Sequence, residues 1–198
     1  MVEGELKNIF LSASIPSEER NPKYYGSADI IAIRDSVIAL ASVVLPNHRL
    51  IWGGHPSITP IIYYLMEKFD LNIQDHVTLY QTRFFETFFP VDNNKFENIV
   101  FTENLGERDK SVLHMRERMF QENKFAGAVF IGGMEGIEDE FTMFKEFHSE
   151  AVLLPIASTG AAAKSVYENL LPDELKNEKL MSDYGYMTLF QNLLIEKI

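Results

Sequence analysis

The 198-residue chain contains no cysteine. Disulfide bonds, thiolate nucleophiles and metal sites with cysteine ligands are therefore excluded. Its five histidines are scattered through the sequence without the spacing of metal ligands, so we expect neither a metal site nor a cofactor. These histidines are His48, His55, His76, His114 and His148.

Several enzyme motifs are also missing. There is no GxGxxG dinucleotide fingerprint, no GxSxG nucleophile elbow and no HExxH zinc motif. The segment "STGAAAKS", Ser158–Ser165, has no glycine before its lysine and lacks the loop length of a P-loop. NTPase chemistry is therefore not expected.

Positive charge is scarce: 18 Lys and Arg stand against 29 Asp and Glu, for a formal net charge of −11. This balance disfavours nucleic-acid and anionic-membrane partners. It leaves room for a small anionic ligand, because backbone N–H groups at a helix N-terminus can hold a phosphate whatever the global charge. No apolar run approaches the ~20 residues of a membrane helix, and the first residues lack an export pattern. We expect a cytoplasmic protein.

Short apolar runs alternate with helical patterns. The predicted strands are Asn8–Ala13, Arg49–Trp52, His76–Gln81, Asn98–Glu103, Gly127–Ile131 and Ala151–Ile156. The predicted helices are Ile30–Leu45, Ser57–Phe69, Arg108–Asn123, about Ile137–His148, and one that begins after Ser158–Gly160. Continuous apolar strands followed by helices indicate a Rossmann-like, doubly wound α/β fold with a mostly parallel sheet and helices on both faces. We expect one domain over residues 1–198, with a helix at about 180–198 packed on it or on a partner.

Small or turn-forming residues follow four of the predicted strands. Parallel sheets bind ligands beyond the carboxyl ends of their strands, so we expect these corners to converge on one cleft. The candidate ligand-binding residues are Ser12, Ser14, Gly53, Gly54, His55, Ser57, Gly132, Gly133, Gly136, Ser158, Thr159 and Gly160. For Gly53–Ser57, an ordinary tight turn is an equally good explanation. A lone histidine such as His55 is more often structural.

Three acids follow the last glycine of "GAVFIGGMEGIEDEF". The helix macrodipole alone favours Glu138, Asp139 and Glu140 there, by ~0.3–1 kcal/mol each. A helix beginning near Ile137 would turn Glu140 toward the cleft, so we predict that Glu140 is the functional acid. On this basis Glu140→Gln should impair binding or turnover and leave the melting temperature nearly unchanged.

An aromatic segment separates the third and fourth predicted strands. Its members are Phe84, Phe85, Phe88 and Phe89. So many phenylalanines near a loop are more typical of a core or a dimer contact than of a platform that stacks on bases. We therefore predict a homodimer that forms through this segment and through helices.

The stretch "MRERMFQENKFAGAVFIGGMEGIEDEF" resembles the signature region of the LOG phosphoribohydrolases. The resemblance places Gly132 and Gly133 on the family's double glycine, Gly136 on its third glycine and Glu140 on its glutamate. It places Arg116, or failing that Arg118, on the family's arginine. "IFLSAS" and "LIWGGHPSITP" resemble the family's first two strand exits, so the likeness extends from Ile9 to about Ala163.

The chain departs from the LOG pattern at Ile131, at Ile137, at His55-Pro56 and by one inserted residue before Gly136. These departures make it more similar to the sensor-type branch of the wider SLOG superfamily. That resemblance implies binding of a nucleotide-derived signal in bacterial signalling or defence, with an effector protein as a partner. The alternative is an N-glycosidic hydrolase that uses Glu140 and Arg116 on a nucleoside monophosphate. A third interpretation is an interaction protein whose glycine corners are ordinary turns.

Overall fold

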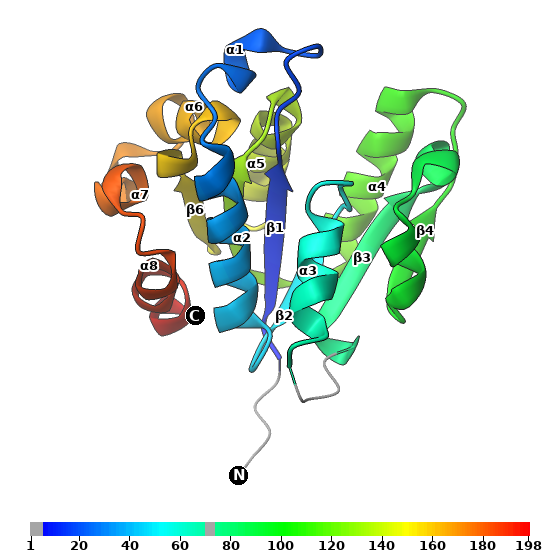
Figure 1. Ribbon diagram of the computed structural model, residues 1–198, viewed down its shortest axis with the longest axis horizontal. Coiled ribbons are helices and arrows are strands. Elements are labelled where there is room, and N and C mark those ends of the chain that lie inside the picture. The colour runs from blue at the N-terminus through cyan, green and yellow to red at the C-terminus, as the bar shows by residue number, and fades with distance from the viewer. Residues whose placement is uncertain (1–5, 70–73) are drawn as a thin grey trace.

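The computed structural model describes residues 6–69 and 74–198. Six strands form one sheet in the order β4-β3-β2-β1-β5-β6, and all of its pairings are parallel (Figure 1). The strands are β1 Asn8–Ser14, β2 Arg49–Trp52, β3 Val77–Thr82, β4 Ile99–Thr102, β5 Phe125–Gly132 and β6 Val152–Ile156. The predicted Rossmann-like α/β fold is thereby confirmed.

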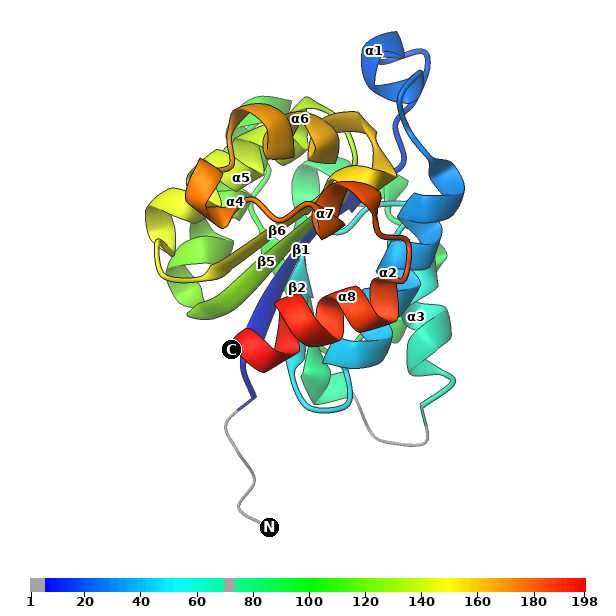
Figure 2. The ribbon, with the colours of Figure 1, turned by 90° about the vertical axis from the view of Figure 1, so that its left-hand side faces the viewer.

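Helices cover both faces of the sheet. The α-helices are α1 Pro22–Tyr25, α2 Ile30–Val44, α3 Thr59–Met66, α4 Arg108–Glu122, α5 Glu135–Phe147, α6 Ala161–Asn169, α7 Lys179–Ser182 and α8 Tyr186–Leu193. Figure 2 shows α2 and α3 on one side of the sheet and α4 and α5 on the other. The C-terminal helix α8 packs against α2. No helix in the described parts of the chain has the length and apolarity needed to cross a membrane.

The central strand β1 anchors the core because both of its faces are covered. Phe10 is fully buried and stacks on Phe144 of α5, with ring centroids 5.5 Å apart. The ring of Phe120, on α4, contacts the Phe10 ring edge-on, with centroids 5.0 Å apart. Such aromatic pairs add about 0.5–1.5 kcal/mol to the burial of their area. They fix α4 and α5 against the strand whose end supports the site described below.

Two element boundaries differ from the sequence prediction. Helix α5 begins at Glu135 rather than near Ile137, because Met134 is the last extended residue before it. Helix α3 is shorter than predicted and begins at Thr59, with Pro60 in its first turn. The aromatic segment between β3 and β4 forms 3-10 turns, η2 Arg83–Phe88 and η3 Val91–Lys95, instead of a crossover helix.

The order of the strands in the sheet determines where the site lies. The chain runs outward from β1 to β4 and then returns to the other side of β1 as β5. In doubly wound sheets such a reversal opens a crevice at the carboxyl ends of the strands, where loops on either side of it diverge.

Candidate functional site

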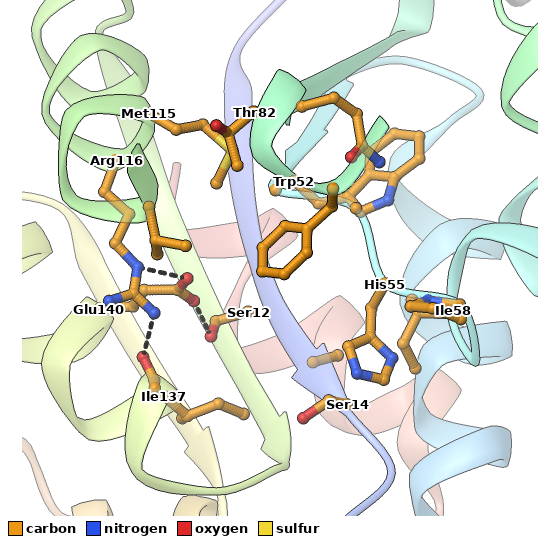
Figure 3. A pocket seen from close by; sticks show the side chains of 18 of the residues that line it. Ser12, Ser14, Trp52, His55, Ile58, Thr82, Met115, Arg116, Ile137 and Glu140 are labelled. Atoms are coloured by element: carbon orange, nitrogen blue, oxygen red, sulfur yellow. Dashed lines mark hydrogen bonds and ion pairs between the residues drawn. The ribbon is translucent and has the colours of Figure 1, made fainter. Parts of the chain in front are cut away.

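A pocket of about 360 Å³ lies over the carboxyl ends of β1, β2 and β3. Helices α4 and α5 close one side of it, and the aromatic turn η2 closes the other (Figure 3). Of the residues predicted from the sequence, eight line the pocket: Ser12, Ser14, Gly53, Gly54, His55, Arg116, Gly136 and Glu140. The volume is within the range of small-ligand sites.

A carboxylate and a guanidinium form one wall of the pocket. The Nε of Arg116 donates to the Oε1 of Glu140 at 2.9 Å, and its second terminal nitrogen donates to the Gly136 carbonyl at 3.0 Å. Only 13% of the Arg116 side chain and 16% of the Glu140 side chain are exposed. The hydroxyl of Ser12, at the end of β1, donates to the other oxygen of Glu140 (Figure 3). Glu140 is therefore held from two sides and retains free lone pairs for a ligand.

The two acids beside Glu140 have other positions. Asp139 is exposed and lies 3.6 Å from a terminal nitrogen of Arg116. Glu138 accepts a hydrogen bond from the Tyr24 hydroxyl at 3.0 Å. Burial, followed by this bond, raises the pKa of Tyr24 to about 12. Glu140 is thus the only acid of the three that lines the pocket.

His55 belongs to the corner after β2. The backbone N–H of Ser57 donates to its Nδ1 at 3.2 Å, so the proton of the neutral ring is on Nε2. Burial, with a smaller contribution from Arg20, lowers the pKa of His55 to about 4. The ring is therefore neutral near pH 7 and offers an N–H donor in a pocket-lining position.

An aromatic wall faces the ion pair. Phe85, Phe88 and Phe89 of the turn after β3 line the pocket together with Trp52 at the end of β2. Phe88 is 75% exposed, so its part of this wall is open to solvent. A core or dimer role was expected for these phenylalanines. The structure brings three of them to the pocket, because the 3-10 turn folds back over the strand ends, and the dimer stays a prediction.

Two further arginines line the pocket, and sequence reasoning did not single them out. Arg20 precedes α1, and Arg108 begins α4. Their side chains are about half exposed, with single ion-pair contacts of 3.3 Å to Glu135 and 3.5 Å to Asp109. The "IPSEERNPKYYGSAD" segment carries no local signal for such a role. A further buried polar side chain, Gln81 at the end of β3, also lines the pocket.

Three of the expected ligand-binding residues make hydrogen bonds within the protein and do not line the pocket. The N–H of Gly132 donates to the Thr159 hydroxyl at 2.9 Å, and the N–H of Gly133 donates to the Ser14 carbonyl at 2.8 Å. Neither glycine lines the pocket, and both have positive φ. Ser57 also lies outside it, since its hydroxyl accepts from the N–H of Ile15 at 3.3 Å and contacts His55. We assign these residues to the turns that shape the site.

The corner Ser158–Gly160 does not line the pocket, contrary to the expectation that all four corners converge. It follows β6, which β5 separates from β1. Ser158 contacts the C-terminal segment, where its hydroxyl lies 3.1 Å from that of Tyr186. Thr159 is fully buried.

Comparison with known proteins agrees with this architecture. No curated protein matches the chain. A model of the SLOG cluster3 family matches residues 23–194, a span that includes every strand after β1 and most of the pocket-lining residues. The chain therefore belongs to the SLOG cluster3 family.

Proposed function

We propose that the pocket binds a nucleotide or a nucleotide-derived signal. The observation that carries this proposal is a local reversal of charge. The whole chain has a net charge of −11, yet the charged residues that line the pocket are three arginines and a single acid. Because Arg116 is paired with Glu140, the half-exposed Arg20 and Arg108 are the groups available to a phosphate. Membership of a SLOG family fits a nucleotide-related function.

The pocket offers separate chemistry for each part of a nucleotide. Glu140 has lone pairs beyond those used by Ser12 and Arg116, and these can accept from sugar hydroxyls. The open wall of Phe85 and Phe88 can stack on a base, a contact worth about 1–3 kcal/mol per base. The side chains of Arg20 and Arg108 can pair with phosphate oxygens.

A thermal-shift panel of nucleoside monophosphates and dinucleotides tests this proposal. A ligand at 100 times its Kd adds about 2.7 kcal/mol of stability. At about 2–4 °C per kcal/mol this raises the melting temperature by ~5–10 °C. Arg20→Met and Arg108→Met should each weaken binding. Arg34→Met is the matched control, because Arg34 is exposed and does not line the pocket. The absence of a shift with every nucleotide would refute the proposal.

A second candidate function is N-glycosidic hydrolysis, favoured by the Ser12–Glu140–Arg116 array. Water would add to the sugar carbon C1′, and the base would leave with a proton, so that a nucleoside monophosphate gives ribose 5-phosphate and a free base. The Glu140 carboxylate could orient a sugar hydroxyl and stabilise positive charge on the ring. Release of free base that is lost in Glu140→Gln would support hydrolysis. A thermal shift without release would support a sensor.

For a sensor, the bound signal would be passed on in bacterial signalling or defence, either to an effector protein or to a second copy of the chain. Phe88 and Val91, which are 75% and 80% exposed, adjoin the pocket wall and could form such a contact. Light scattering with and without the ligand found in the panel tests this role. A ligand-dependent change in assembly is the expected result for a signal passed between copies. For an effector partner, ligand-dependent binding to the product of a neighbouring gene is expected.

A further inference from the structure

The carboxamide of Gln81 lies at the pocket and makes no side-chain hydrogen bond to the described residues. Gln81 is 5% exposed and lines the pocket. None of the side-chain hydrogen bonds within residues 6–69 and 74–198 involves it. A primary amide has two donors and an acceptor, and those of Gln81 are available to a ligand in the pocket. The pocket is the side from which these groups can be satisfied.

The missing side chain of Gly54 gives the Gln81 amide its room. Trp52 pairs with Leu79 in the sheet, so Gly54 and Gln81, each two residues further on, face each other beyond the last paired residues. Gly54 has φ +69°, and a Cβ on it would overlap the Gln81 carboxamide. The glycine corner after β2 therefore makes room for Gln81. The amide therefore lies close to the Gly54 backbone, and no side-chain hydrogen bond in the described chain involves it.

Gln81 differs from the polar groups of the described chain that are fully buried and lack partners. The unpartnered atoms belong to His48, Asn93 and Thr102, and none of these residues lines the pocket. Among the described residues, Gln81 combines a largely buried side chain, an amide without a side-chain hydrogen bond and a place beside the aromatic wall. A few polar groups fixed in an apolar pocket are what sets the orientation of a bound ligand.

We infer that Gln81 is a specificity-determining residue that hydrogen-bonds in a bidentate manner to the edge of the ligand's heterocycle. The ligand class is a base that presents a hydrogen-bond donor beside an acceptor. The amide nitrogen donates to the ring acceptor, and the amide oxygen accepts from the neighbouring N–H, a pairing that glutamine makes with base edges. This inference rests on the proposed function of the pocket.

The test compares ligands with and without a base. Binding of AMP, GMP, CMP, UMP and ribose 5-phosphate is measured by calorimetry on the wild-type protein and on Gln81→Met, which keeps the size of the side chain. We expect at least one monophosphate to bind the wild type more tightly than ribose 5-phosphate does. Gln81→Met should weaken that monophosphate about tenfold, in line with the discrimination of one bidentate contact. Its affinity for ribose 5-phosphate should stay the same.

Two further variants serve as checks. Thr102→Val removes a buried unpartnered hydroxyl away from the pocket and should leave all affinities unchanged. Gly54→Ala should displace the Gln81 amide and reproduce the selective loss. If the monophosphate binds Gln81→Met and wild type equally, or if ribose 5-phosphate weakens in parallel, the inference is refuted while the proposed function stands. If only a dinucleotide of the thermal-shift panel binds the wild type, it takes the place of the monophosphate in this comparison. If neither the five compounds nor any nucleotide of the panel binds, the proposed function fails, and this inference fails with it.

Discussion

Replacing Glu140 by glutamine removes the negative charge from its partly buried pair with Arg116. The two side chains are 13% and 16% exposed and are joined at 2.9 Å. At an effective dielectric constant of about 20, unit charges ~4 Å apart attract by ~4 kcal/mol. Removing one partner of a buried ion pair costs about 3–5 kcal/mol of stability. Arg116 keeps the Gly136 carbonyl at 3.0 Å and Asp139 at 3.6 Å, which reduces the loss. We expect Glu140→Gln to lower the free energy of unfolding by about 2 kcal/mol.

This expectation revises the one made from the sequence, in which Glu140→Gln leaves the melting temperature nearly unchanged. For a chain of this length a loss of about 2 kcal/mol lowers the melting temperature by ~4–8 °C. The assay is a double-mutant cycle of Glu140→Gln and Arg116→Met, in which urea unfolding gives the free energy of unfolding of each variant. The double variant leaves neither charge buried without its partner. Its loss of unfolding free energy should therefore be smaller than the sum of the two single losses by more than about 1 kcal/mol.

A matched ion pair at the surface provides the control. Lys110 and Glu107 are 2.7 Å apart, but both side chains are mostly exposed. Lys110→Gln should therefore leave the unfolding curve almost unchanged, because exposed pairs are screened by water and salt. If the losses at Glu140 and Arg116 simply add, the pair does not act as a coupled unit in the pocket wall, and the reasoning is refuted.

Three other predictions follow from the same geometry. The pKa of His55 is held near 4, below the ordinary 6.5, so its contribution to stability is complete above pH 6.5 and is lost as the pH falls to 4. Wild type should lose up to about 3 kcal/mol more than His55→Gln over this range, and parallel unfolding curves would contradict this. Gly160→Ala should cost at least about 1 kcal/mol, because Gly160 has φ +70° and an added Cβ would overlap the Ser27 carbonyl. Nucleotide affinity should not change; if it falls, that corner belongs to the site after all. Finally, we expect a homodimer through the exposed Phe88, converted to a monomer by Phe88→Asp, whereas light scattering that shows a monomeric wild type would count against it.

Sequence patterns were sufficient for the sheet and for one half of the pocket. Apolar runs mark every strand, because buried parallel strands need apolar side chains on both faces, and small or turn-forming residues follow four of them. The rule that ligands bind at carboxyl ends of strands then places Ser12, Ser14 and the glycines after β2 correctly at the pocket. The helical register places Glu140 there as well, although α5 begins two residues earlier than predicted.

The other half could not be predicted, because it depends on strand order. Sequence patterns predict strands but not their neighbours in the sheet. With β5 between β1 and β6, the corner at Ser158–Gly160 is two strand spacings, about 10 Å, from the end of β1. The aromatic turn was missed for a similar reason. No local pattern shows that Phe85 and Phe88 fold back over β2 and β3. Gln81 and Thr82 did have a usable signal, as two polar residues that end an apolar strand.

The contact between Gly54 and Gln81 has a consequence for evolution within the family. A side chain at position 54 would occupy the space of the Gln81 amide, so position 54 cannot become larger unless the amide moves or position 81 becomes smaller. Relatives that carry a larger residue in place of Gly54 should have a shorter one in place of Gln81, and their ligand preference should differ as well. The two positions are 27 residues apart in the chain. Their covariation would divide the family into groups with different ligand preferences, even before any ligand is identified.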